Sequence, residues 1–146
     1  IEDLLAQDVS LMITLSRRTP KALTGRLAGT FGGRDRVWLF DGEGENPYFA
    51  FLAAADWIFV TEESTNMLVE ASATGKPVYI LPMDGSAGKF ARLHAALEGI
   101  GAVRPWLGRL EKWSYTPLAE TIRAANLLIA RWRPELASAS PNGDTL

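Results

Sequence analysis

The chain has 146 residues, a hydrophobic content of 47% and a formal net charge of −2 at pH 7. This length and composition predict one globular domain, and the mixed charges exclude a general attraction for nucleic acid or an anionic membrane surface. There is no cysteine, which excludes a disulfide framework and a cysteine metal site, and no apolar run approaches the roughly 20 residues of a transmembrane segment.

The first predicted strand covers residues 9–15 and leads directly into a polar turn and a helix. Thr19 is predicted to cap that helix, with Pro20 at its first position and an apolar face of Ala22, Leu23, Leu27 and Phe31. The turn also holds Ser16, Arg17 and Arg18. Guanidinium groups match phosphate oxygens, so this turn is a candidate anion site, although ordinary surface charge is the alternative.

The second predicted strand covers residues 37–40, and the acidic, glycine-rich loop 41–45 follows it. Asn46 is expected to cap the next helix, with Pro47 at its first position. Four side chains are expected to pack this helix against the core: Tyr48, Phe49, Phe51 and Leu52. Aromatic residues at this density indicate core rather than a cofactor site.

Residues 56–82 form the central unit of the chain, with the predicted order strand, turn, helix, turn, strand. The run 57–60 suits a strand that is buried on both faces. Ser64 is expected to cap the helix, whose inward stripe is Met67, Leu68 and Ala71, and Gly75 with Pro77 ends it. Residues 78–81 are the second buried strand, which makes this unit a parallel βαβ crossover.

Two acids give the central unit a chemical interpretation. Glu62 lies at the end of the first strand, and Glu70 lies on the second turn of the helix. The polar residues between them are Glu63, Ser64, Thr65 and Asn66. The unpaired N–H groups of a helix start favour an anion, so a nucleoside diphosphate fits this layout, with its hydroxyls on a carboxylate. The alternative is that Ser64 only caps the helix and that the acids are solvated.

The C-terminal third begins with the glycine-rich loop 83–88. Lys89 follows at a helix start, where a cation is unfavourable for the helix dipole, so either an anion partner or simple solvation is expected. His94, the only histidine, is expected to have a structural role rather than to act as a general base. A short strand at 103–105, an irregular aromatic connection and a long helix from Thr116 complete a domain 1–134, and residues 135–146 are expected to be a disordered tail.

Strands that alternate with helices predict a three-layer α/β/α sandwich around a parallel sheet of about five strands. There is no Gly-x-Gly-x-x-Gly and no Walker sequence, which excludes a standard dinucleotide-binding fold and a P-loop enzyme. There is also no Asp-x-Asp triplet, and no metal or separate cofactor is expected.

Residues 62–78, EESTNMLVEASATGKPV, resemble the Glu-x7-Glu and Glu-Ala-x-Ala-x-Gly-x-Pro-Val segment of the nucleotide-sugar-binding domain of GT-B glycosyltransferases. The resemblance implies a Rossmann-like C-terminal half of a GT-B fold. It implies further that Glu70 holds the donor ribose hydroxyls and that Glu62 lies near the donor sugar. Asp41 and Gly42 become candidate neighbours of the base; a connecting loop without a ligand role is the alternative.

Other segments resemble a narrower family. NPYFAFLAAADWIFVTEES and GKPVYILP, with SRRTP, GKFARLH and GRLEKW, are similar to the bacterial and plant mitochondrial fission (elongated mitochondria) proteins. Bacterial members carry the label nucleoside-diphosphate-sugar epimerase. The chain departs from the lipid-linked peptidoglycan transferases, because it lacks their glycine-rich first loop and has two acids after Thr61. Acids repel a diphosphate unless they face sugar hydroxyls.

Three functions follow as expectations from these resemblances. The first is donor binding in a glycosyltransferase, with a nucleoside-diphosphate sugar as substrate and the catalytic base on a missing N-terminal domain. The second is a glycosyltransferase-like scaffold that recruits protein partners, and the third is a nucleoside-diphosphate-sugar epimerase. The chain does not begin with Met and shows no signal peptide, so we expect it to be an excised part of a cytoplasmic protein. Any peripheral contact with a membrane is expected to be made by the missing half of that protein.

Overall fold

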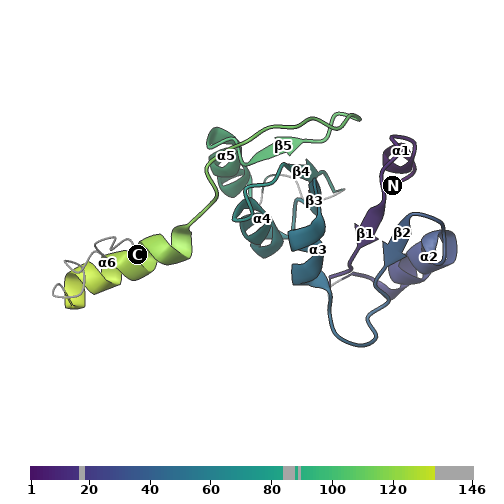
Figure 1. The fold of residues 1–146 in the computed structure, drawn as a ribbon, viewed down its shortest axis with the longest axis horizontal. Coiled ribbons are helices and arrows are strands. Elements are labelled where there is room, and N and C mark those ends of the chain that lie inside the picture. The colour runs from purple at the N-terminus through teal and green to yellow at the C-terminus, as the bar shows by residue number, and fades with distance from the viewer. Residues whose placement is uncertain (17–18, 84–87, 89, 134–146) are drawn as a thin grey trace, which may run out of the picture.

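A computed structural model describes residues 1–16, 19–83, 88 and 90–133 of the chain (Figure 1). Helices and strands alternate along it, as the sequence predicts. The elements in chain order are α1 (Glu2–Leu5), β1 (Leu11–Ile13), α2 (Lys21–Phe31), β2 (Val37–Leu39), α3 (Tyr48–Ala54), β3 (Ile58–Thr61), α4 (Thr65–Ser72), β4 (Val78–Leu81), α5 (Ala91–Gly99), β5 (Val103–Pro105) and α6 (Glu120–Trp132).

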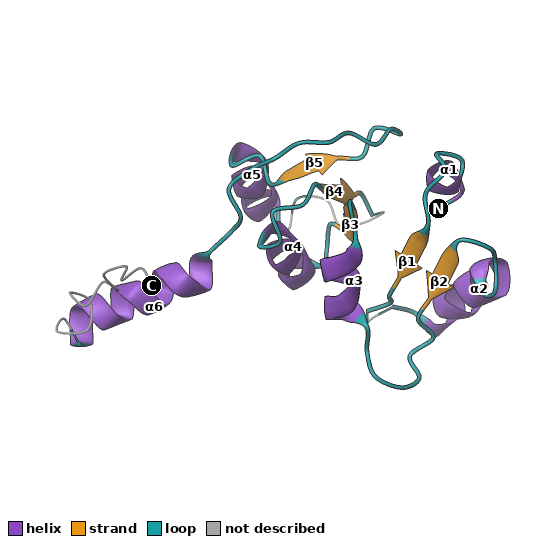
Figure 2. Ribbon diagram, viewed as in Figure 1, coloured by secondary structure: helices purple, strands orange, loops and turns teal. Residues whose placement is uncertain are grey.

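The strands are parallel throughout, which confirms the α/β class, but they form two sheets rather than one. β1 pairs with β2, and β3, β4 and β5 pair in that order (Figure 2). The edges of β1 and β3 that carry no partner strand both line a cavity of about 1060 Å³. This space lies between the two ladders, where a single five-stranded sheet would pair β1 with β3.

The buried core lies on one face of the three-stranded sheet. Alternate strand residues point to that face, among them Ile58, Val60 and Val78, and they meet Leu68 of α4 and Leu97 of α5. Both helices connect adjacent parallel strands, so they cover the same face. The predicted inward stripe of α4 is confirmed, because Leu68 and Ala71 have no exposed surface and Met67 packs against the core.

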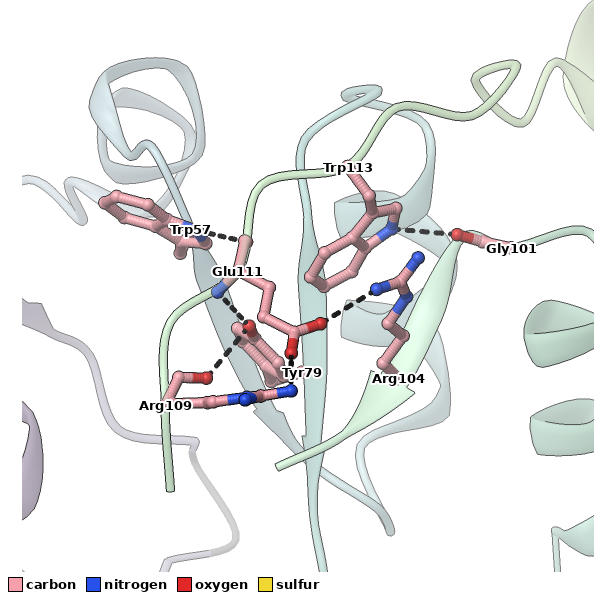
Figure 3. Close-up of polar contacts among 7 residues, drawn as sticks. All are labelled: Trp57, Tyr79, Gly101, Arg104, Arg109, Glu111 and Trp113. Atoms are coloured by element: carbon pink, nitrogen blue, oxygen red, sulfur yellow. Dashed lines mark hydrogen bonds and ion pairs between the residues drawn. The ribbon is translucent and has the colours of Figure 1, made fainter. Parts of the chain in front are cut away.

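An irregular strap runs through residues 106–119; its first part, 106–113, covers the other face of this sheet in place of a helix, whereas Tyr115 and Leu118 pack against the core. Phe59 and Tyr79 stack there with ring centroids 5.0 Å apart, and Trp106 and Trp113 meet Tyr79 edge-on. Figure 3 shows how polar groups fasten the strap: Glu111 N–H donates to Tyr79 Oη over 2.7 Å, and Trp113 Nε1 donates to the Gly101 carbonyl over 2.9 Å. The predicted aromatic connection is therefore part of the packing.

Two predicted helix starts differ from the structure in detail. Thr19 does not cap α2, which begins at Lys21 with Pro20 in the capping position and no side-chain cap. At α3 a proline likewise holds the capping position, because the helix begins at Tyr48 after Pro47, and the predicted cap Asn46 lies one residue earlier, where its Oδ1 accepts the Tyr48 N–H over 3.0 Å. The expected packing of Phe49 is wrong: its side chain is 72% exposed, whereas Phe51 is buried and contacts Trp38 of β2.

The last helix begins later than predicted and projects from the rest of the chain (Figure 1). Leu118 N–H donates to the Ser72 carbonyl over 3.1 Å, and this contact keeps the strap extended past Thr116 and Pro117. The apolar residues of α6, among them Ile122, Leu128 and Trp132, are exposed instead of packed. The predicted tail, residues 135–146, lies outside the described residues.

Gly75 is a position where we expect substitution by alanine to destabilise the fold. Its φ of +75° is in the left-handed region, and an added Cβ would lie 2.9 Å from Cγ of Pro117 in the strap. Left-handed backbone costs a non-glycine residue about 1–2 kcal/mol, and the contact with the strap adds to this. Denaturant unfolding of Gly75→Ala should therefore give a free energy of unfolding that is lower than that of wild type by at least this amount.

Gly44→Ala is the matched control for this prediction. Gly44 also has a left-handed backbone, with a φ of +79°, but nothing lies within 4 Å of an added Cβ. The two variants share the backbone cost, so the difference between them measures the contact with Pro117. Equal losses in both would contradict the close approach of the strap to the end of α4.

Candidate functional site

A cleft of about 400 Å³ lies where the carboxyl end of β1 meets the starts of α3 and α4. The described residues that line it come from these three places: Thr14, Leu15 and Ser16 after β1, Asn46 and Tyr48 at α3, and Met67 in the first turn of α4. The carboxyl edge of parallel strands is where ligands bind in open α/β folds. Ser16, predicted from the sequence, is thus part of a cleft, whereas Thr19 does not line it.

The start of α4 adjoins this cleft with its backbone N–H groups available. Ser64 occupies the predicted N-cap position, but its side chain makes no capping hydrogen bond. Its Oγ instead lies 3.2 Å from Oγ1 of Thr61. The first N–H groups of a helix have no partners within the helix, so those from Thr65 to Met67 can receive an anion.

Glu63 leaves one carboxylate oxygen without a hydrogen bond. Its Oε1 accepts from Thr61 Oγ1 over 2.8 Å, while Oε2 is buried and has no partner among the described residues. A buried, unsatisfied carboxylate oxygen is costly, and a hydroxyl donor from a bound molecule would satisfy it. Glu63 lines neither of the two cavities, and its Oε2 is shielded from solvent in this structure.

Glu62 connects the carboxyl ends of β3 and β4 with α5. Its Oε1 accepts the Met83 N–H over 2.7 Å, and its carbonyl oxygen lies 2.9 Å from Nε2 of His94. The contact agrees with the structural role expected for His94. Glu62 is thus part of the same edge as the cleft, but it contacts the loop after β4 in this structure.

Glu70 reaches the cleft through another residue. Tyr48 Oη donates to Glu70 Oε2 over 2.6 Å, and burial together with the Glu70 carboxylate raises the pKa of Tyr48. Tyr48 lines the cleft, whereas Glu70 is exposed on the second turn of α4 and does not line it. The two predicted parts of the site, Ser16 and Glu70, are therefore linked by a tyrosine that the sequence assigned to packing.

Lys76 fixes α3, and hence Tyr48, to the end of the α4 unit. Its Nζ donates to the carbonyls of Leu52 and Ala53, over 2.8 and 2.5 Å, in the last turn of α3. A cation at a helix C-terminus satisfies free carbonyls and is favourable for the helix dipole. The Gly-Lys-Pro sequence after α4 therefore holds one wall of the cleft.

The remaining predicted site residues fall into two groups. Arg17, Arg18 and Lys89 lie outside the described residues. Asp41 and Gly42 are described but line neither cavity, and the Asp41 carboxylate accepts the Glu43 N–H over 2.9 Å within its own loop. Asn66 is exposed in the first turn of α4, and Thr65 precedes it at the helix start.

The sequence pattern did not identify Tyr48 and Asn46 as residues that line the cleft. It assigned Tyr48 to packing and Asn46 to helix capping. Both lie at the start of α3, where Asn-Pro-Tyr gives a helix-start signal and the aromatic run indicates only packing. The one available signal was the position of this helix start at the carboxyl edge. Within the described ranges, no group of three His, Asp or Glu side chains converges to form a metal site. None of the helices described there has the length and apolar character to cross a bilayer.

Comparison with known proteins places the chain in a family. Residues 1–132 match the protein family described as Mitochondrial fission ELM1. The chain belongs to the Mitochondrial fission ELM1 family. It is 37% identical over 139 residues to the Mitochondrial fission protein ELM1 of Arabidopsis thaliana, an alignment that covers 93% of this chain and 32% of that protein.

A second relative of this ELM1-family chain is bacterial. The chain is 29% identical over 128 residues to Uncharacterized protein RP120 of Rickettsia prowazekii (strain Madrid E). This alignment covers 84% of this chain and 36% of that protein. The chain thus spans about a third of the length of these two relatives. No solved structure matches it significantly. The narrower family resemblance seen in the sequence is confirmed.

Proposed function

We propose that this ELM1-family chain binds a nucleoside-diphosphate sugar at the carboxyl edge of its parallel strands. The observation that carries the proposal is the 400 Å³ cleft, which brings Ser16 and Tyr48 next to the uncapped start of α4. The helix start supplies N–H groups for the diphosphate. Tyr48, which lines the cleft, supplies an acceptor for a hydroxyl.

The charges near the cleft support a division of the ligand between two regions. The six described lining residues are all neutral, which suits a base and a ribose. Glu62 and Glu63 lie between β3 and α4, and their carboxylates suit the hydroxyls of a sugar rather than a phosphate. In the sequence, Arg17 and Arg18 come after β1 and Lys89 comes after β4. We propose these three residues as partners of the diphosphate.

The reaction that we favour for the complete protein is glycosyl transfer. In that role this chain would hold the donor, and helix N-termini and the nearby cations would stabilise the leaving diphosphate. The acceptor and the catalytic base would come from a further domain of the same protein. An epimerase acting on the same nucleotide sugar would use the same cleft and also needs a base from outside this chain.

A thermal-shift screen tests the proposed ligand class. Nucleoside mono- and diphosphates and their sugar conjugates would each be added at about 1 mM; a ligand at a hundred times its dissociation constant stabilises the fold by about 2.7 kcal/mol, which is a shift of several degrees. We expect diphosphates of one base to shift the midpoint. The absence of a shift with every compound, on folded protein, would contradict the proposal.

A protein-recruiting scaffold is the second candidate, and the exposed face of α6 favours it. Ile122 and Trp132 on this helix are 63% and 72% exposed, and the Arabidopsis relative is named as a mitochondrial fission protein. Large exposed apolar faces mark interaction sites. Saturable binding of a purified partner, lost in Ile122→Ser/Leu128→Ser but retained in Leu127→Ser on the opposite side of α6, would favour this function if the cleft binds no nucleotide.

A further inference from the structure

Among the described residues that line the 400 Å³ cleft, Tyr48 is the one whose side chain is seen to hydrogen-bond to Glu70 of α4. Glu70 Oε2 accepts a hydrogen bond from Tyr48 Oη over 2.6 Å. The resemblance to GT-B domains implies that Glu70 itself takes the ribose hydroxyls. In this structure Tyr48 lines the cleft and Glu70 does not.

The direction of this hydrogen bond determines what the phenol can offer a ligand. A phenol has one proton, and an ionised carboxylate can only accept. Tyr48 therefore donates to Glu70, and the lone pairs of its oxygen remain to accept a second hydrogen bond. A phenol is ordinarily protonated at neutral pH, and burial together with the Glu70 carboxylate raises the pKa of Tyr48 further, so Tyr48 stays the donor in this bond.

The surroundings of the phenol fit the uncharged end of a nucleotide. Thr14 and Ser16 contribute hydroxyls, and Leu15 and Met67 contribute apolar surface. Asn46 lies beside them, with its Oδ1 already accepting the Tyr48 N–H. Asn46 also fixes the backbone of Tyr48 at the start of α3, which limits the positions that the ring can take. An acceptor held in this way selects a ligand that donates a hydroxyl proton.

We propose that the Tyr48 phenolic oxygen accepts a hydrogen bond from a ribose hydroxyl of the nucleotide, and that Glu70 is a positioning residue that holds the phenol. The inference rests on the proposed function, because it concerns the same cleft. It differs from the implication of the resemblance in one respect that can be tested. The negative charge of Glu70 is not needed for contact with the ligand, whereas the phenolic oxygen is.

The test is calorimetric titration of the complete protein with UDP, ADP and GDP and with their 2′-deoxy and 3′-deoxy analogues. Tyr48→Phe should weaken binding of the ribonucleotide that binds wild type by about tenfold, the effect of one lost hydrogen bond. The same variant should bind one of the two deoxy analogues as tightly as wild type does, because the donor is already missing. This dependence on one ligand hydroxyl would not arise from general destabilisation.

Glu70→Gln and Glu70→Ala separate positioning from direct contact. Glutamine keeps an acceptor for the Tyr48 proton, so Glu70→Gln should stay within about threefold of wild type, whereas Glu70→Ala should resemble Tyr48→Phe. The double variant Tyr48→Phe/Glu70→Ala should bind the nucleotide no more weakly than either single variant does. Tyr115→Phe is the matched control, because that phenol donates to the Lys76 carbonyl over 2.9 Å and lines neither cavity.

Three outcomes would overturn the inference. Unchanged nucleotide affinity in Tyr48→Phe would remove the phenol from the site while leaving the proposed function intact. Equal losses in Glu70→Gln and Glu70→Ala, with no dependence on Tyr48, would show that the carboxylate itself contacts the ribose. If none of the three nucleotides or their sugar conjugates binds wild type, the proposed function fails together with the inference.

Discussion

Replacing Glu70 with alanine is expected to weaken nucleotide binding by about tenfold or more while the fold stays intact. The carboxylate accepts the Tyr48 hydroxyl over 2.6 Å. A ligand hydrogen bond made by Glu70 itself, or by the phenol that it holds, contributes about 1–3 kcal/mol to binding. A loss of about 1.4 kcal/mol is already tenfold in the dissociation constant. This loss is expected whether Glu70 contacts the ribose directly or holds Tyr48 in place.

The exposure of Glu70 makes this variant a clean test of binding. The side chain is on the solvent side of α4, and the core contacts of that helix come from Leu68 and Ala71 instead. Glu70→Ala should therefore lower the free energy of unfolding by no more than about 1.5 kcal/mol, the net contribution of one hydrogen bond, so that the fold stays intact. Unchanged affinity, measured by calorimetry, would remove Glu70 from the site.

The second large effect is expected in the core, at Leu68. Its side chain is 0% exposed and lies among Val60, Val78 and other residues under the three-stranded sheet. Buried leucine-to-alanine substitutions cost about 2–5 kcal/mol, because apolar contacts are lost and a cavity remains. We expect Leu68→Ala to lower the free energy of unfolding by an amount in this range, measured with denaturant.

Leu127→Ala provides the matched control, because the same atoms are removed from an exposed position. Leu127 lies on α6 and is 60% exposed, so its substitution should change the free energy of unfolding by no more than about 0.5 kcal/mol. A comparable loss in both variants would contradict the arrangement described above. It would mean that α6 packs against the chain as firmly as α4 does.

The central βαβ unit could be predicted closely from the sequence. β3, α4 and β4 begin and end within a residue or two of the expected positions. The reason is local: buried apolar runs define both strands, and Gly75 with Pro77 ends the helix. The carboxyl edge could be located for the same reason, since it follows from the order of elements alone.

Contacts between distant segments explain what the sequence did not predict. Pro117 and Thr116 form a good helix-start signal, yet the bond from Leu118 N–H to the Ser72 carbonyl holds that stretch in the strap. The role of Tyr48 likewise depends on Glu70, which is 22 positions away on another helix. Local patterns cannot show whether Tyr48 or its exposed neighbour Phe49 faces inward.

The division of the sheet was also outside the reach of local patterns. The runs that predict β1 and β3 specify two parallel strands, but they do not specify whether the two strands pair. In the structure a cavity of about 1060 Å³ lies along both edges. The strand count could be predicted from alternation, whereas the pairing of β1 with β3 depends on packing across the whole domain.

Backbone amide chemical-shift mapping during a nucleoside diphosphate titration tests the central claim most directly. The account predicts saturable shifts at Ser16, at Tyr48 and at the α4 start from Thr65 to Met67, with α6 and the strap unaffected. These positions come from three separate parts of the sequence that meet only at the cleft. Shifts centred on α6, or none with any nucleotide on folded protein, would contradict a donor site at this edge.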